Sequence, residues 1–394
     1  MKKNILILLL SLFSFSCFAN NDSTLINALV KNIALMQVKQ YDGEFYEGMF
    51  YGYRQSGGAP HNYVKDNNIF FTAIAAFAFR NMLPYLSQDN KLIANSIISK
   101  AAATYPKFQN RAGLPFYNFW ASDGTFMPNS LYFKYLRPIF GQGEDADDTV
   151  MILMSAENND SSNRVAKKRM IGVSNLSRRK IISTFKGYRN LPAYSTWMGF
   201  KMTPDFDFSV QCNIMYFMYD KHLPFVKQDT ATLQYLAEMV KNRYYLSRPV
   251  YISPYYVKSS VLLYHISRLM GAFNIPLLEQ YKPQLAADIR EELQKSTNVM
   301  DQIILRTSLL RLHENAPPLD LNSIEEFEKS NQKKYIFFQA RPAFSYPTPA
   351  KQILLHFSYF NSHFYCPAYN KTLWLEYLVE KNKRGSAKEI IELQ

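Results

Sequence analysis

Four carboxylates lie close together in the chain, at Glu144, Asp145, Asp147 and Asp148. Carboxylates this close repel one another, and burial would raise the pKa of at least one of them. A carboxyl group that stays protonated at neutral pH can deliver a proton, and an ionised neighbour can stabilise the resulting cation. Asp145, Asp147 and Asp148 are therefore candidate catalytic residues. The alternative is structural, because an aspartate here can cap the N-terminus of the apolar helix that follows.

A second short string lies far upstream and reads Glu47-Gly48-Met49-Phe50-Tyr51-Gly52. It fits the Glu-Gly-x-x-Tyr-Gly string of family-eight glycoside hydrolases, and Asp145-Ala146-Asp147 resembles the Asp-Gly/Ala-Asp motif that opens an inner helix in that family. Those enzymes are exported α/α toroids. The resemblance implies that Glu47 protonates the leaving oxygen, with Tyr51 in the substrate site. An aspartate of the 145–148 cluster would then bind the sugar or help to position water.

The run from Asp145 to Thr149 also resembles the Asp-x-Asp-Asp-Thr signature of class II terpene cyclases, which are α/α toroids too. That resemblance implies that Asp147 protonates an alkene. The chain has three Trp residues and lacks the repeated Gln–Trp motifs of those cyclases. A glycoside hydrolase-like enzyme is therefore the first hypothesis and cyclase-like chemistry the second. The third is a non-catalytic periplasmic or secreted binding protein, whose acidic cluster only caps a helix.

Further candidate binding residues are acidic or aromatic. Asp205 and Asp207 form a second acidic pair at the head of an apolar run, where they could face the same cleft or cap a helix. Aromatic rings that could stack on a sugar or on a carbocation are Tyr117, Phe119, Trp120, Tyr255 and Tyr256. Packing in the core is the alternative for each ring taken singly.

Hydrophobic periodicity predicts a chain dominated by helices. Segments that are apolar nearly all round alternate with amphipathic segments that would cover them. The expected helices are 68–86, 92–104, 148–156, 164–184, 209–219, 230–245, 257–270, 277–295 and 298–313, and the best strand signal is 335–339. Polar residues precede the apolar members, so the N-termini of an inner ring would gather at one mouth. We expect an all-α fold, an α/α toroid with a few short strands, with an irregular α-solenoid as the alternative.

The first residues resemble a bacterial secretory signal peptide. Lys2 and Lys3 precede a short apolar run, and small residues precede Asn20. We expect residues 1–19 to be removed and 20–394 to form a single helical domain that is periplasmic or secreted. A lipid anchor at Cys17 is the alternative, and no later segment predicts a transmembrane span. In an oxidising compartment Cys212 and Cys366 could pair, but the sequence leaves this open.

The remaining patterns exclude several function classes. The six histidines show no metal-ligand spacing, and no phosphate-binding loop or dinucleotide fingerprint occurs, so we expect neither a metal nor a cofactor. Positive charge gathers in 164–170 and 178–180. These residues could meet nucleic acid, acidic lipid headgroups or an anionic polysaccharide, or form a solvated helix face. We expect a polysaccharide or another small hydrophobic or sugar ligand as the partner, and no nucleic acid.

Overall fold

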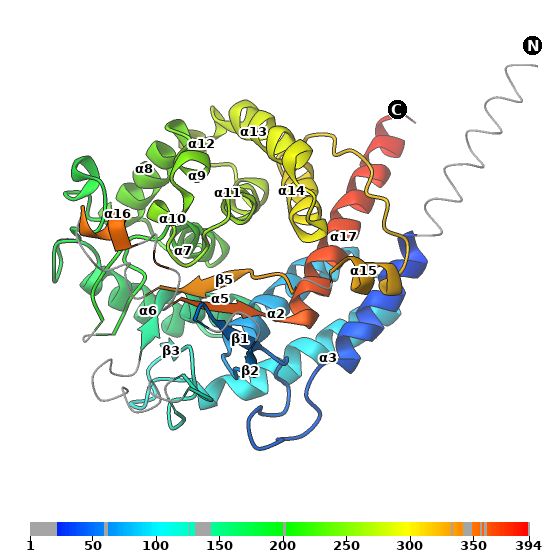
Figure 1. The fold of residues 1–394 in the computed structure, drawn as a ribbon, viewed down its shortest axis with the longest axis horizontal. Coiled ribbons are helices and arrows are strands. Elements are labelled where there is room, and N and C mark those ends of the chain that lie inside the picture. Colours follow the sequence, from blue (N-terminus) through cyan, green and yellow to red (C-terminus); the bar gives the residue numbers. More distant parts are fainter. Residues whose placement is uncertain are drawn as a thin grey trace, which may run out of the picture.

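Helices dominate the structure (Figure 1). The computed structural model describes residues 22–58, 62–125, 127–130, 143–199, 202–331, 334–341, 349–354, 357 and 361–392. The all-α prediction is therefore confirmed at the level of fold class. Within those ranges, no helix is long and apolar enough to cross a membrane.

Six helices contact one another in a closed cycle, which we call the six-helix cycle. They are α2 (Phe70–Met82), α5 (Ala146–Ser155), α7 (Phe208–Asp220), α11 (Ser259–Ala272), α14 (Val299–Arg311) and α17 (Pro367–Glu392). Each packs against the next along the chain, and α17 packs against α2. Every residue of α5 is buried, as expected for a helix that is apolar on all faces and covered on all of them.

The helices of the cycle place their N-terminal ends together. Tyr256, which precedes α11, donates a hydrogen bond to Asp147 in the first turn of α5, and its ring centroid lies 6.3 Å from that of Phe70 in α2. Ser260 of α11 donates a 2.6 Å hydrogen bond to Asp301 in the first turn of α14. Contacts given below bring the first turns of α7 and α17 to the same place. We call this the N-terminal end of the cycle and the opposite side its C-terminal end.

Other helices cover the outside of the cycle. They are α3 (Gln88–Thr104), α6 (Asp160–Val173), α8 (Lys227–Lys241) and α13 (Lys282–Lys295), together with a helix over residues 22–35. Each labelled member packs against the cycle helix next to it in the chain. The first helix is tied to α17 by a 2.7 Å hydrogen bond from Lys371 Nζ to Asn32 Oδ1.

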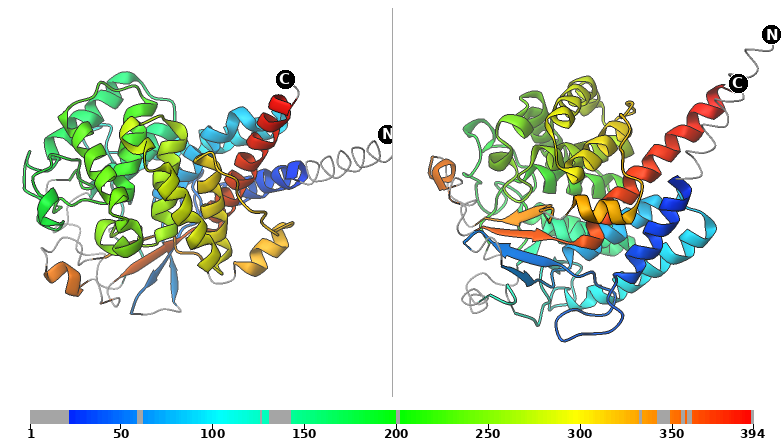
Figure 2. Two further views of the ribbon diagram at one scale, coloured as in Figure 1. Left: turned by 90° about the horizontal axis from the view of Figure 1, so that it is seen from above. Right: turned by 45° about the vertical axis from the view of Figure 1, so that its right-hand side comes forward.

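An antiparallel four-stranded sheet lies over the N-terminal end of the cycle (Figures 1 and 2). Its order is β2 (Tyr63–Lys65), β1 (Tyr53–Ser56), β6 (Ser362–Tyr365) and β5 (Phe338–Ala340). Phe338 packs on Phe70 and Phe71 at the start of α2, while Phe337 packs on Tyr369 in the first turn of α17 and on Tyr256. The sheet therefore covers the α2 and α17 side of this end with aromatic side chains.

The remaining elements are short. They are η1 (Leu83–Tyr85), η2 (Tyr105–Lys107), β3 (Tyr117–Asn118), β4 (Glu144–Asp145), η4 (Lys186–Tyr188), α9 (Tyr244–Ser247), α10 (Pro249–Ile252), α12 (Pro276–Glu279), α15 (Ile324–Ser330) and α16 (Ala350–Leu354). The expected strand at 335–339 forms only in part, as β5.

The expected helix over 164–184 is wrong in its second half, since α6 ends at Val173. Asn175 explains the stop. Its side chain accepts a hydrogen bond from Ile181 N and donates to the carbonyls of Arg189 and Leu191, and these bonds hold the chain in a turn.

The two cysteines that could pair do not. Cys212 lies inside α7 and Cys366 directly before α17, and both are buried and free. Cys17 and the rest of the proposed signal peptide lie outside the described residues.

Candidate functional site

Asp145 and Asp207 each begin a helix of the cycle. Asp145 Oδ1 accepts a 2.7 Å hydrogen bond from Asp148 N at the start of α5, and Asp207 Oδ1 accepts hydrogen bonds from Ser209 N and Val210 N at the start of α7. Both therefore serve as N-caps, which is the structural role that the sequence left open. Capping accounts for one oxygen of each residue and leaves the other for further interactions.

Asp147 occupies a polar position inside the cycle. Its Oδ1 accepts a 2.6 Å hydrogen bond from Asn213 Nδ2 of α7, and its Oδ2 accepts one from the Tyr256 hydroxyl. Arg268 of α11 donates in turn to Asn213 Oδ1. Burial raises the pKa of Asp147 to about 6, and these donors together with the Arg268 charge oppose that rise. These donors and the Arg268 charge therefore offset part of the effect of burial on Asp147, whose pKa still lies above its ordinary value.

Asp145 and Asp148 form a carboxyl pair with different surroundings. Burial raises the pKa of Asp145 to about 7, and the neighbouring Asp147 charge adds to the rise. Burial and the Asp145 charge raise the pKa of Asp148 well above its usual range. Asp148 is fully buried, and neither of its oxygens accepts a hydrogen bond from a described residue. A protonated Asp148 can donate to Asp145, so this pair holds at least one proton near neutral pH.

A second carboxyl pair begins α7. Burial raises the pKa of Asp205 to about 7 and that of Asp207 to about 6. Asp205 Oδ2 accepts a 2.9 Å hydrogen bond from the Tyr255 hydroxyl, and Asp207 Oδ2 accepts one of 3.0 Å from Tyr255 N. Lys351 lies close enough to lower the pKa of Asp205, but burial lowers its own pKa to about 8, and its Nζ donates to two carbonyls. Both aspartates are completely buried.

A short backbone segment connects the two carboxyl pairs. Trp197 pairs with Asp145 as an antiparallel bridge, and on its other side Thr196 N donates to the Asp205 carbonyl. Tyr117 of β3 also pairs with Asp145. The indole of Trp197 donates a 2.8 Å hydrogen bond to the Tyr255 hydroxyl. Three partly exposed aromatic residues thus surround the aspartates.

Two predicted ring platforms are engaged in packing instead. Phe119 makes edge contacts with Phe338 and Phe364 of the sheet. Trp120 donates its indole hydrogen to Asp66, which also pairs with Arg54. Tyr256 is buried against Asp147 and the sheet, as described above. Among the five predicted rings, only Tyr117 and Tyr255 combine partial exposure with a contact to one of the candidate aspartates of 145–148 and 205–207.

Glu47 and Tyr51 have neighbours other than the aspartates of the 145–148 cluster. Glu47 is exposed, and its carbonyl accepts a 2.7 Å hydrogen bond from Thr104 at the end of α3. The pKa of Tyr51 is raised by burial and by its neighbour Asp42. Across the described ranges, no hydrogen bond or ion pair connects Glu47 to the aspartates.

Both glycines of the Glu47–Gly52 string have a structural explanation. Gly48 has φ of +89°, and a Cβ there would meet the Lys100 carbonyl oxygen at 2.1 Å. A Cβ at Gly52 would meet the Asp66 carbonyl oxygen at 2.7 Å. Close backbone approach and positive φ therefore require these glycines without any catalytic role.

The basic stretch of α6 is only partly a solvated face. Lys167 is buried and forms a 2.8 Å ion pair with Asp229 of α8. Arg169 forms a 3.3 Å ion pair with Glu144, whose other oxygen accepts a hydrogen bond from Asn110. Glu144 is therefore held by a cation, in contrast to the three aspartates that follow it.

The sequence predictions did not include four residues of this region. Asn213 and Arg268 are polar residues within apolar helical runs, and that contrast was an available signal. Trp197 and Lys351 lie in segments with no motif. No group of three or more His, Cys, Asp or Glu residues suited to a metal ion occurs in the described part of the chain.

Comparison with known protein families, with curated proteins and with solved structures finds no match for this chain. The resemblances to family-eight glycoside hydrolases and to class II terpene cyclases therefore stay predictions that depend on short strings.

Proposed function

We propose that this protein is an exported carbohydrate-active enzyme, glycoside hydrolase-like, built as an α/α toroid. The closed cycle of six helices and the helices outside it support the toroid, since such a barrel consists of inner and outer helices in alternation. The aspartates at the N-terminal ends of α5 and α7 then lie at one mouth of the barrel.

The observation that carries the proposal is the contrast between Asp145 and Asp147. Asp145 shares a proton with Asp148. Asp147 instead accepts two hydrogen bonds, and the positive charge of Arg268 lowers its pKa. Acid and base roles follow where environments favour different protonation states of neighbouring carboxyls. Each keeps 7% exposure, while Asp148 is fully buried. Asp145 is the proton donor in this proposal, and Asp147 is the ionised carboxylate.

The proposed reaction is hydrolysis of a glycosidic bond. Asp145 transfers its proton to the leaving oxygen as the bond to the anomeric carbon breaks, and Asp147 stabilises the positive charge that develops there. Water adds to the anomeric carbon and its proton returns to the Asp145–Asp148 pair. Tyr117, Trp197 and Tyr255 offer the aromatic faces on which sugar rings stack. This scheme assigns no step to Glu47, which stays a prediction from the short string.

Two observations favour glycan chemistry over cyclase-like protonation at Asp147. Both Asp147 oxygens accept hydrogen bonds, so neither presents a proton to an alkene. Asn213 and the Arg268 guanidinium beside it make the surroundings polar, whereas a carbocation route needs a dry aromatic cavity.

The test is a screen of neutral and anionic polysaccharides for released reducing ends, with wild type, Asp145→Asn and Asp160→Asn. Asp160 also lies in the first turn of a helix, but its side chain is 84% exposed. We expect Asp145→Asn to lose about 10²–10⁴-fold in rate and Asp160→Asn to match wild type. A wild-type protein that binds glycans without cleaving them, or an active Asp145→Asn variant, would contradict the proposal.

Export has its own test, because it concerns residues 1–19. The protein is produced with its leader in a Gram-negative host, and the N-terminus from the periplasmic fraction is read by mass spectrometry. We expect the mature chain to begin at Asn20. A chain that begins at an acylated Cys17 would instead indicate the lipid anchor, and an intact Met1 in the cytoplasm would exclude export.

A further inference from the structure

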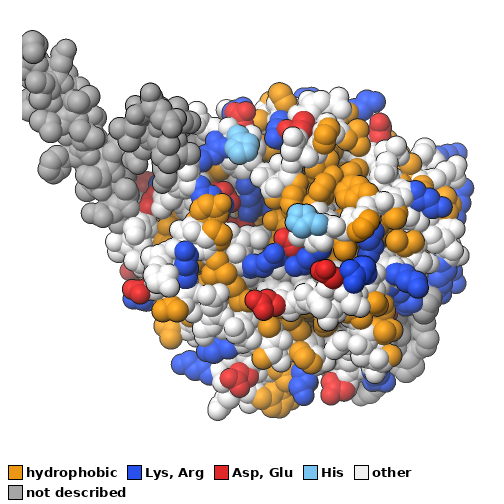
Figure 3. Space-filling view, turned by 180° about the vertical axis from the view of Figure 1, so that it is seen from behind, with side chains coloured by type: hydrophobic (Ala, Val, Ile, Leu, Met, Phe, Trp, Pro, Cys, Tyr) orange, Lys and Arg blue, Asp and Glu red, His pale blue; other side chains and the backbone are white. Residues whose placement is uncertain are grey.

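The C-terminal end of the cycle contains a pocket of about 610 Å³. Five helices of the cycle contribute to its lining: α2, α7, α11, α14 and α17. Figure 3 shows this face, opposite the sheet, with Lys and Arg side chains gathered beside a hollow. The volume falls in the range of small-molecule sites. None of the candidate catalytic aspartates lines it.

Positive charge dominates the lining. Four cationic side chains, Arg268, Arg311, Lys383 and Arg384, face one carboxylate, Glu380. Arg311 forms a 2.5 Å ion pair with Glu376, and Lys383 forms one of 2.9 Å with Glu380. In the described part of the chain, no carboxylate lies within ion-pair distance of Arg268 or Arg384. Neither guanidinium group therefore contacts a carboxylate directly, although Asp147 and Glu376 act on Arg268, and Glu380 and Glu314 on Arg384, over longer distances.

Arg268 is the more deeply placed of the two. It is 4% exposed, and the rings of Phe77 and Tyr264 lie 5.3 and 5.4 Å from its guanidinium carbon. Its NH2 group donates to Asn213 Oδ1, and no other acceptor among the described residues receives a hydrogen bond from it. A guanidinium has five N–H donors, so most of those of Arg268 stay available.

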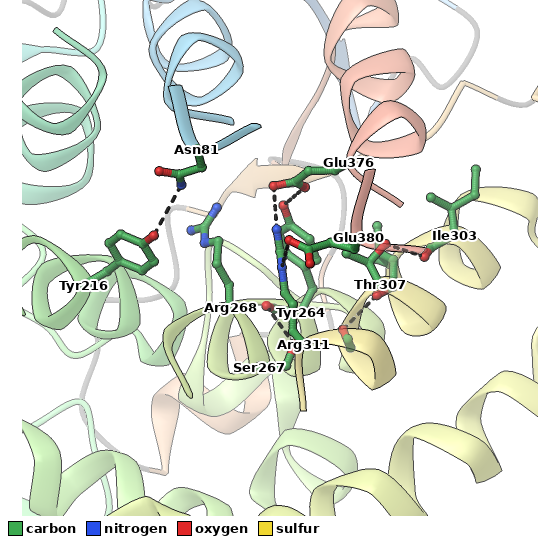
Figure 4. A network of polar contacts seen from close by, with 12 residues as sticks. Asn81, Tyr216, Tyr264, Ser267, Arg268, Ile303, Thr307, Arg311, Glu376 and Glu380 are labelled. Atoms are coloured by element: carbon green, nitrogen blue, oxygen red, sulfur yellow. Dashed lines mark hydrogen bonds and ion pairs between the residues drawn. The ribbon is translucent and has the colours of Figure 1, made fainter. Parts of the chain in front are cut away.

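Arg311 supplies a second unused donor from the neighbouring helix. Its side chain is 9% exposed, and its NH1 group is buried without a hydrogen-bond partner among the described residues. Figure 4 shows Arg268 and Arg311 on adjacent helices, with Glu376 and Glu380 beside Arg311 and the Asn81–Tyr216 pair across the space. A buried donor without an acceptor is costly, and an anion would satisfy it.

We infer that this pocket binds a small anion that carries a phosphate or carboxylate group. Planar guanidinium groups match the oxygens of both groups, and the Asn81–Tyr216 pair adds neutral polar contacts at the wall. Arg268 also acts on Asp147 through Asn213, but the inference does not depend on the proposed function, because anion binding is measured without glycan hydrolysis.

Cations near helix C-termini also complement the helix dipoles, and this effect alone would place Arg and Lys here. Dipole complementation produces no saturable binding of an anion, so a titration distinguishes the two explanations.

The test is calorimetric titration of the full chain with inorganic phosphate and, separately, with citrate, at constant ionic strength kept with sodium chloride. The variants are Arg268→Met and Arg384→Met, and the matched control is Lys295→Met on α13, whose side chain is 60% exposed. We expect saturable binding of at least one anion, at least tenfold weaker in both pocket variants and unchanged in the control. If Arg268→Met does not fold, the titration of Arg384→Met alone tests whether the pocket binds the anion.

Preference for phosphate or for citrate identifies which group the site recognises. Absence of saturable binding of either anion by the wild type would overturn the inference. Equal binding by Arg384→Met and by wild type would overturn it as well.

Discussion

The two ends of the six-helix cycle neutralise buried charge in different ways. At the C-terminal end, carboxylates are paired with cations, as in Arg311–Glu376 at 2.5 Å and Arg80–Asp220 at 3.0 Å. At the N-terminal end, five aspartates are buried, and within the described ranges none of them forms an ion pair with Lys or Arg: Asp145, Asp147, Asp148, Asp205 and Asp207. Burial raises the pKa of each, and Asp145, Asp148 and Asp205 can therefore carry protons near neutral pH in place of a cation partner. Carboxyls that carry protons near neutral pH suit acid catalysis, whereas ion pairs suit stability.

The largest effect is expected at the C-terminal end, from Arg311→Met. This change leaves Glu376, which is 2% exposed, with a hydrogen bond from Tyr264 but without its cation. Removing one partner of a buried ion pair costs about 3–5 kcal/mol, so urea unfolding should show a loss of that size. Arg290→Met removes an ion pair whose side chains are both at least 40% exposed and should cost less than about 1 kcal/mol. Equal losses of unfolding free energy for Arg311→Met and Arg290→Met would contradict the expected difference between buried and exposed ion pairs.

The next effect concerns the cap of α7. Asp207 accepts hydrogen bonds from two backbone amides of α7, from the Ser253 hydroxyl and from Tyr255 N. Asp207→Ala leaves these buried donors unsatisfied and should lower the free energy of unfolding by about 2–4 kcal/mol. Asp207→Asn keeps one acceptor oxygen, so its free energy of unfolding should fall by less than that of Asp207→Ala. Similar losses for the two variants would show that the hydrogen bonds matter less than the charge.

The pH dependence of stability tests whether protons neutralise the N-terminal end. The pKa of Asp205 rises from 3.8 to about 7 on folding, so the folded state binds this proton more tightly than the unfolded state. The contribution of this proton to the free energy of unfolding is complete below pH 3.8, and it is lost as the pH rises through about 7. Between pH 5 and pH 8, wild type should therefore lose about 1–3 kcal/mol more than Asp205→Asn. The free energies of unfolding are measured with urea at each pH. An equal change for the two proteins between pH 5 and pH 8 would contradict this sign.

The smallest effect is expected from Trp197→Phe. This change keeps an aromatic face beside Asp145 but removes the hydrogen bond to the Tyr255 hydroxyl. The net loss should be about 1 kcal/mol in stability. Glycan affinity, measured by titration with the substrate that the screen identifies, should change less than with Trp197→Ala. A larger affinity loss for Phe than for Ala would exclude stacking as the role of this ring.

Most of the helices were predictable from hydrophobic patterning. The expected segments at 209–219 and 298–313 lie within two residues of α7 and α14 at either end, since apolar runs that begin at clear caps, Asp207 and Asn298, define them. The helix over 22–35 and α17 were not predicted, and neither were β1, β2 and β6. Short strands depend on pairing between residues far apart in the chain, as in Tyr53 with Tyr365, and no local signal reports that pairing.

The candidate site was predictable only in its carboxylates. Asp145, Asp147, Asp148, Asp205 and Asp207 were named from their spacing, and the structure gathers them at one end. The partners that set their protonation come from other helices and were not visible in local sequence, as with Asn213 for Asp147. The two glycines of the Glu47–Gly52 string fit close backbone packing, so agreement with a motif was not evidence of chemistry there.

Carbon-13 NMR of the aspartate side-chain carboxyls tests the central claim most directly, because it reads each protonation state without a substrate. Labelled wild type is titrated from pH 3 to pH 9, and Asp→Asn variants assign the signals. We expect midpoints near pH 7 for Asp145 and Asp205 and near pH 6 for Asp147 and Asp207. Midpoints for all four close to the ordinary aspartate value of 3.8 would contradict it.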